Sequence, residues 1–134
     1  MKFALKVIAV LILIPALLIG GLVFYWWVTY IDESVTSGSA YGFTIGHSKQ
    51  VVAQQFPSIT EDHPKLHVYV SYGRRAGDNF SIPANGQAIS KLMQHDKWDL
   101  LLNGQWEFFD SIDLYFENDK LVKIYRHRQN FELP

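Results

Sequence analysis

The histidines of this 134-residue chain are the first residues to weigh for chemistry, because imidazole is the commonest metal ligand and general base. His63 and His67 are four residues apart, but Pro64 disfavours a shared helical face and no carboxylate stands between them, as it does in a zinc-protease helix. Histidines at the surface explain the pair more simply. We therefore expect no metal site here.

Aspartates and cysteines give no clearer sign of catalysis. Two aspartate pairs, Asp96 with Asp99 and Asp110 with Asp113, flank the ends of expected strands, where solvated charges are the simpler interpretation. Cysteine is absent, which excludes disulfides, thiolate metal ligands, a cysteine nucleophile and a lipid-modified cysteine. The sequence has no Gly-Xaa-Ser-Xaa-Gly motif and no phosphate-binding loop. We expect a protein that is not an enzyme and needs no cofactor.

A row of tyrosines and histidines is more informative, because strand alternation places it on the side of the sheet opposite the apolar residues. Tyrosine supplies rigid contact area with a polar tip and is favoured at protein interfaces. Pairing of tyrosines across strands, worth about 0.2 to 1 kcal/mol each, is the alternative explanation. The candidate partner-binding residues are His67, Tyr69, Tyr115, Tyr125 and His127, and they share this face with Asp113, Glu117 and Lys123. Arg126 to Arg128 would form either a cationic edge for an acidic partner or an ordinary solvated edge strand.

The strands that must position these residues are read from alternation. Leu66 to Tyr72 alternates with Val68 and Val70 on its apolar side. Trp98 to Leu102 leads into an Asn103-Gly104 hairpin turn, after which Trp106 and Phe108 resume the pattern. Ile112 to Glu117, a turn at Asn118 to Lys120, and Leu121 to Arg128 form a second hairpin. These segments predict an antiparallel sheet of three to four strands.

Two helices are expected to cover that sheet. Ser48 is a good N-cap and Pro57 a good stop, and the helix between them is expected to bury Val51, Val52 and Phe56. A second, short helix is expected over 87–95, after a long loop over 74–86 that contains glycine and proline. The fold class is therefore α+β, with two helices packed on the sheet.

The N-terminal segment 7–31 has no charged side chain and is long enough to cross a bilayer. Lys2 and Lys6 precede it, whereas Asp32 and Glu33 follow, so the positive-inside rule places residues 1–6 in the cytoplasm. The aromatic residues expected at the outer membrane interface are Tyr25, Trp26, Trp27 and Tyr30. A signal peptide cleaved near Gly38 and Ala40 is the alternative, but those residues lie well beyond the apolar run.

The remaining chain divides into a short polar linker over 32–40 and a domain over 41–134. This outer part is mildly acidic, since all 13 acidic residues lie at or beyond Asp32. It shows no cluster of Lys and Arg along one face, so we expect no nucleic-acid partner.

Two segments of the outer part carry a pattern known from a protein family. The first is Ile45-Gly46-His47-Ser48 with Val51 and Phe56-Pro57, which has a glycine, a capping residue and a helix. The second is the expected hairpin over 112–122. Together they resemble the opening helix and the closing hairpin of the SmpA/OmlA family, the outer-membrane assembly lipoprotein E-like family, whose fold is shared with β-lactamase inhibitor proteins. This chain has a spanning helix where the family has a lipid-carrying cysteine, and the expected helix over 87–95 has no obvious counterpart. The resemblance implies the fold and a general role in binding proteins, but no individual binding residue.

These observations predict a single-pass protein of a bacterial inner membrane with its domain in the periplasm. The domain is expected to dock onto a larger membrane or envelope-assembly complex. The alternative is an immunity or inhibitor protein that neutralises a toxin or hydrolase acting in the periplasm.

Overall fold

The computed structural model describes residues 2–72, 75–81, 86–102 and 109–129, with only the backbone path at 2–5, 71–72, 75–81, 86–88 and 109. The chain divides into two compact units, residues 1–30 and residues 31–134. The expected hairpin turn at Asn103-Gly104, together with Trp106 and Phe108, lies outside the described residues.

The first unit is a single helix, α1 (Lys2–Thr29), as the apolar run predicts. It ends where the hydroxyl of Thr29 donates to the carbonyl of Tyr25 at 2.7 Å. Over Lys6–Thr29 it is long and apolar enough to cross a membrane, and it is the one such helix in the described part of the chain. Tyr25, Trp27 and Tyr30 are exposed at its C-terminal end, and Trp26 is half-buried.

The segment expected to be a flexible linker begins with regular structure. β1 (Ile31–Val35) pairs antiparallel with β8 (Lys120–Gln129). β2 (Ser39–Ala40) and β3 (Phe43–Thr44) form a small hairpin. Its turn residues Tyr41 and Gly42 have φ of 54° and 83°. The expectation of a linker over 32–40 is therefore wrong for 32–35, because pairing with a distant strand gives this polar segment a structure that its composition does not indicate.

The helix expected between Ser48 and Pro57 is two short helices, α2 (Lys49–Gln54) and α3 (Phe56–Asp62). The hydroxyl of Ser48 accepts a hydrogen bond from the backbone N–H of Val51, which confirms the N-cap. Pro57 does not end the helix. It lies in the first turn of α3, where its missing N–H has no intrahelical partner to lose.

The sheet is larger than expected, because six described strands pair in the order β1-β8-β7-β6-β4-β5 and every pair is antiparallel. Its other members are β4 (His67–Tyr72), β5 (Arg75–Ser81), β6 (Lys97–Leu101) and β7 (Phe109–Glu117). The expectation of three to four strands missed β1 and β5, and β5 lies in the segment expected to be a loop. The turn between β7 and β8 is confirmed, with Asn118 and Asp119 both at positive φ.

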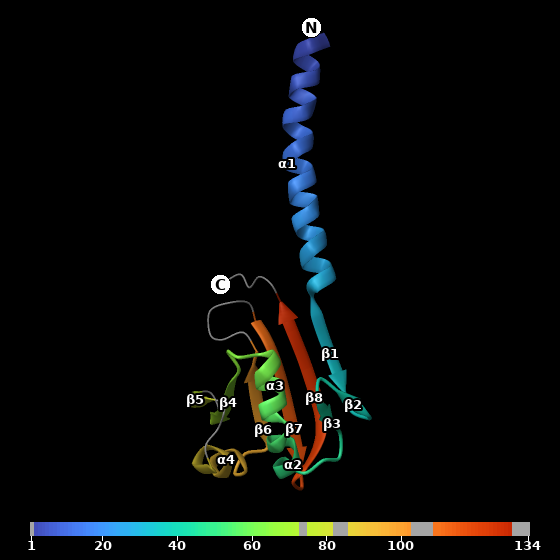
Figure 1. Ribbon diagram of the computed structural model, residues 1–134. Coiled ribbons are helices and arrows are strands. Elements are labelled where there is room, and N and C mark those ends of the chain that lie inside the picture. The colour runs from blue at the N-terminus through green and yellow to red at the C-terminus, as the bar shows by residue number, and fades with distance from the viewer. Residues whose placement is uncertain (1, 73–74, 82–85, 103–108, 130–134) are drawn as a thin grey trace. The chain divides into compact units, whose positions relative to one another are not determined.

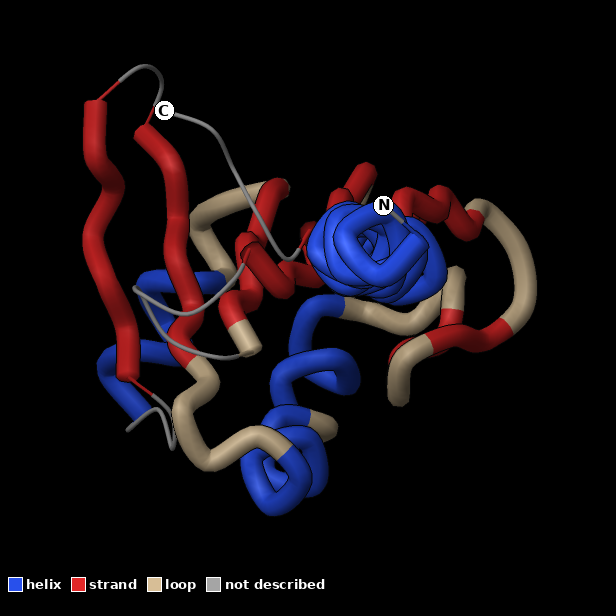
Figure 2. The backbone as a smooth tube through the Cα atoms, turned by 90° about the horizontal axis from the view of Figure 1, so that it is seen from above, coloured by secondary structure: helices blue, strands red, loops and turns tan. Residues whose placement is uncertain are grey.

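The helices α2 and α3 lie on one face of this sheet, and α4 (Gly86–Leu92) lies below β4 and β5 in Figure 1 (see also Figure 2) and adds Leu92 to the same core. The described domain thus has three helices where two were expected, and the α+β class is confirmed. Between the layers Trp98 is fully buried, with ring centroids 5.8 Å from Phe56 and 4.5 Å from Phe116. Val52 and Phe56 face this core as predicted, whereas Val51 is exposed.

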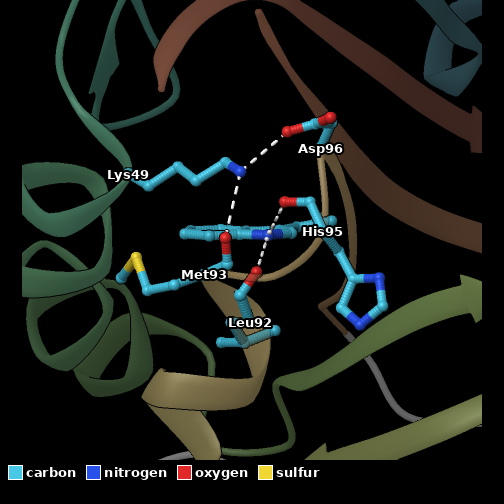
Figure 3. Close-up of polar contacts among 6 residues, drawn as sticks. Lys49, Leu92, Met93, His95 and Asp96 are labelled. Atoms are coloured by element: carbon cyan, nitrogen blue, oxygen red, sulfur yellow. Dashed lines mark hydrogen bonds and ion pairs between the residues drawn. The ribbon is translucent and has the colours of Figure 1, made fainter. Parts of the chain in front are cut away.

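A buried lysine fixes α2 against the loop after α4. The amino group of Lys49 lies 2.7 Å from the Asp96 carboxylate and 3.1 Å from the Met93 carbonyl (Figure 3). The Trp98 indole N–H lies 2.9 Å from the carbonyl of Leu92 and 3.1 Å from that of His95. The Lys49 amino group and the Trp98 indole N–H both bond to groups at the end of α4 and in the loop after it. These bonds therefore fix the chain between α4 and β6.

Candidate functional site

The face of the sheet opposite the helices, here called the tyrosine face, carries all five residues predicted to bind a partner. The register fixes this arrangement, because residues directly opposite on neighbouring strands point to the same side. One row runs Tyr69, Asp99, Asp113, Tyr125 across β4, β6, β7 and β8. A second row runs His67, Leu101, Ser111, His127, and a third Lys97, Tyr115, Lys123. All five predicted residues are half-buried.

At the centre of the tyrosine face one lysine contacts two carboxylates. The Lys97 amino group lies 2.7 Å from Oδ1 of Asp99 and 3.2 Å from Oδ2 of Asp113. The side chains of Asp99 and Asp113 are only 20% and 16% exposed, so water screens the three charges less than at an open surface. The interpretation of these aspartates as ordinary solvated charges is therefore wrong. Each sits on a paired strand instead.

The pKa values of this cluster reflect that burial. Burial raises the pKa of Asp113 above 3.8, and the charge of Asp99 adds to the effect, although Lys97 opposes it. For Lys97, burial acts to lower the pKa, but the bond to Asp99 and the charges of Asp113 and Asp99 outweigh it and raise the pKa. Burial also raises the pKa of Tyr115. The cluster therefore keeps its lysine charged at all physiological pH values.

Cation–π contacts fix the aromatic rings around this cluster. The Lys123 amino group lies 5.1 Å from the ring centroid of Tyr115 and 5.8 Å from that of Tyr125. Lys97 is the neighbour of Tyr115 on β6, and its amino group lies 5.4 Å from the centroid of the Tyr115 ring. Tyr125 stacks on His127 at 6.3 Å. Side chains that are already fixed lose less conformational freedom when a partner binds.

A cavity of about 350 Å³ lies on the helical face of the sheet and was not predicted from the sequence. Its apolar lining includes Ile59, Leu102 and Ile112, and its polar lining includes Tyr41, Asp62, His63 and Arg126. His63 thus lines this cavity while His67 lies on the tyrosine face. The described residues contain no group of three or more His, Cys, Asp or Glu arranged to hold a metal ion.

The cavity is built around a buried arginine. Arg126 is 6% exposed, forms an ion pair with Asp110, and donates to the backbone carbonyls of Ser111 at 2.9 Å and His127 at 3.1 Å. The ring of Tyr41 lies 5.6 Å from its guanidinium. The idea of a cationic or solvated edge strand at 126–128 is therefore wrong, because β1 covers that edge.

The hydroxyl group of Tyr41 is held in place as well as its ring. Its hydroxyl donates to the Glu33 carboxylate at 2.6 Å, and that bond, with burial, raises the pKa of Tyr41. Its positive φ is uncommon for a bulky residue. The sequence did indicate that Arg126 is buried, because Arg126 is two residues after the buried Ile124 and alternation places both on the same face of β8.

No protein-family model, curated protein or solved structure matches this chain. The resemblance to the SmpA/OmlA family therefore stays a prediction from the residues quoted above. In the structure the two segments that carry it are hydrogen-bonded to each other. The N–H of Gly46 donates to the Leu121 carbonyl at 2.7 Å, and that of Leu121 donates back to His47 at 2.9 Å.

Proposed function

We propose that this protein is a single-pass protein of a bacterial inner membrane whose periplasmic domain docks onto a larger membrane or envelope-assembly complex. α1 is the anchor, and the tyrosine face is the docking surface. The observation that supports docking most directly is that three tyrosines and two histidines from β4, β7 and β8 lie half-buried on one face, around a fixed cluster of charges.

The direction of insertion is supported by charge. Lys2 and Lys6 are the only charged residues before Asp32, so the N-terminal flank carries the positive charge that the cytoplasmic side retains. The aromatic residues at the end of α1 belong at the opposite interface. A protease added to spheroplasts should digest the C-terminal domain. Protection of this domain while known periplasmic domains are digested would contradict the topology.

The docking surface is argued from its composition and its order. Aromatic side chains with polar tips supply much of the binding energy at protein interfaces. The tyrosines of the tyrosine face are half-buried, and lysines contact the rings of Tyr115 and Tyr125. Charges that are already paired, as Lys97 is with Asp99 and Asp113, guide partner choice more than they add affinity. The same fixed surface suits an inhibitor, so neutralisation of a periplasm-acting toxin or hydrolase is the second candidate.

A triple substitution tests the tyrosine face. Replacement of Tyr69, Tyr115 and Tyr125 by serine should reduce capture of the partner after cross-linking in intact membranes at least tenfold. The loss of cross-strand pairing should cost only about 1 to 3 kcal/mol in total, so circular dichroism should show a folded domain. Gln54→Ser with Glu61→Ser is the control, because both side chains are exposed on the helices.

The captured protein separates the two candidates. A resident subunit of an envelope complex supports docking, whereas a secreted enzyme supports inhibition. Capture that is unchanged in the triple variant and in the control alike would contradict any role of the tyrosine face.

A further inference from the structure

The cavity around Arg126 has the volume and lining of a small-molecule site. Its volume of about 350 Å³ falls in the range of ligand pockets, roughly 300 to 1,000 Å³. Its apolar wall comes from Ile59 on α3, Leu102 after β6 and Ile112 on β7. Its polar groups come from the β2–β3 turn, the end of α3 and β8. A ligand that fits this lining has an apolar body and a polar head.

The charges around the cavity favour a cationic head. The guanidinium of Arg126 is already matched by Asp110 and by two backbone carbonyls. Asp62 lines the cavity near the C-terminal end of α3, where the helix dipole adds partial negative charge. The Glu33 carboxylate lies against Tyr41, another lining residue. Because Asp110 offsets the charge of Arg126, the Asp62 carboxylate is the lining charge without such an offset, and a primary ammonium group can donate hydrogen bonds to it.

The covalent chain links the cavity to the end of α1. Ile31 lines the cavity, and Tyr30 alone separates it from Thr29, the last residue of α1. Two peptide links span at most about 7 Å, whichever way the domain is oriented. If α1 crosses the bilayer, as the proposed function requires, a lining residue of the cavity is held close to the lipid headgroups.

We propose that this cavity binds the ammonium headgroup of an aminophospholipid such as phosphatidylethanolamine. The ammonium lies near Asp62, and the adjoining apolar part of the lipid contacts Ile59, Leu102 and Ile112. This inference rests on the membrane anchoring in the proposed function, but not on the tyrosine face, which is on the other side of the sheet.

Photo-cross-linking of the full-length chain in vesicles tests the proposal. The vesicles are made of phosphatidylglycerol and phosphatidylcholine and contain a trace of photoactivatable phosphatidylethanolamine or, in parallel, of photoactivatable phosphatidylcholine, whose quaternary head donates no hydrogen bond. Mass spectrometry reads lipid labelling of the tryptic peptide 50–65, which contains α3. We expect at least threefold more labelling by the ethanolamine lipid than by the choline lipid.

Asp62→Asn removes the charge with little change of shape and should lower the ethanolamine labelling at least threefold. Glu61→Gln is the matched control, since Glu61 is the neighbouring exposed carboxylate on α3 and does not line the cavity. Ser58→Trp, at an exposed lining position, should block labelling by volume alone. An equal urea midpoint for all variants confirms that each is folded.

Equal labelling by the two lipids, or an equal loss in the Asp62 and Glu61 variants, would overturn the proposal. Soluble glycerophosphoethanolamine should not compete at the same headgroup concentration, and if it does, the site recognises a free amine and the lipid assignment is wrong. Extraction of the chain from the vesicles by alkaline carbonate would show that the anchoring has failed. If the chain stays in the vesicles without an ethanolamine preference, only the present inference fails.

Discussion

The buried pair of Arg126 and Asp110 allows a prediction whose size follows from the structure. The two side chains are 8% and 7% exposed, so Arg126→Met would leave the Asp110 carboxylate buried without its counter-ion. Removal of one partner of a buried ion pair costs about 3 to 5 kcal/mol. A domain of this size is stable by about 5 to 15 kcal/mol, so the single variant should fold with a much lower urea midpoint.

The double variant Arg126→Met with Asp110→Leu removes both charges at once. It loses two hydrogen bonds to backbone carbonyls, each worth about 0.5 to 1.5 kcal/mol, and the contact with Tyr41, worth about 0.5 to 1 kcal/mol. It gains apolar contacts in their place. We expect it to lie within about 2 kcal/mol of the natural protein, so it should be more stable than either single variant.

Pulse proteolysis in urea is the suitable assay, because it reads unfolding of the domain while α1 stays in a detergent micelle. The four proteins form a double-mutant cycle, and we expect a coupling energy of about 2 kcal/mol or more. A loss below about 1 kcal/mol in Arg126→Met, or a double variant as unstable as the sum of the two single variants, would refute the view that Arg126 serves to neutralise Asp110.

Two further predictions concern Asp113 and Trp98. The pKa of Asp113 is higher in the folded domain than in the unfolded chain. The protonated carboxyl therefore stabilises the folded domain at pH values below its unfolded pKa, and this stability is lost as the pH rises through its folded pKa. Asp113→Asn should therefore flatten the change in urea midpoint between pH 4 and pH 7, with Asp119→Asn as control, and an unchanged slope would contradict this sign. Trp98→Phe leaves the carbonyls of Leu92 and His95 without their indole donor and should cost about 2 to 4 kcal/mol by the same assay. A loss of less than about 1 kcal/mol in this variant would show that the two bonds do not hold the loop.

The sequence predicted best what depends on local pattern. Alternation placed Ile112, Leu114 and Phe116 toward the core, and all three are buried. The Asn-Asp turn followed from the preference of these residues for positive φ. Alternation predicts the faces of β4, β7 and β8 in the same way, so the sequence indicates which residues share the tyrosine face.

What the sequence could not show depends on contacts between distant segments. β1 is a polar segment after a helix, and it becomes a strand through its pairing with residues about ninety positions later. β5 carries a glycine and two charges, which are typical of a loop, yet it pairs along β4. The cavity was not predicted because its lining comes from segments as far apart as Ile31 and Arg126. The one indication in the sequence was that alternation places Arg126 on the buried face of its strand.

The pairing of β1 with β8 has a consequence for how the protein is made. Ile31 pairs with Arg128, so the sheet cannot be completed until the chain up to Arg128 has left the ribosome. The contact between the segment before α2 and the β7–β8 turn adds the same requirement. Sheets that depend on such distant pairings fold slowly, and their incomplete forms expose apolar surface. During synthesis the nascent domain therefore exposes apolar surface for longer than a domain built from neighbouring hairpins would.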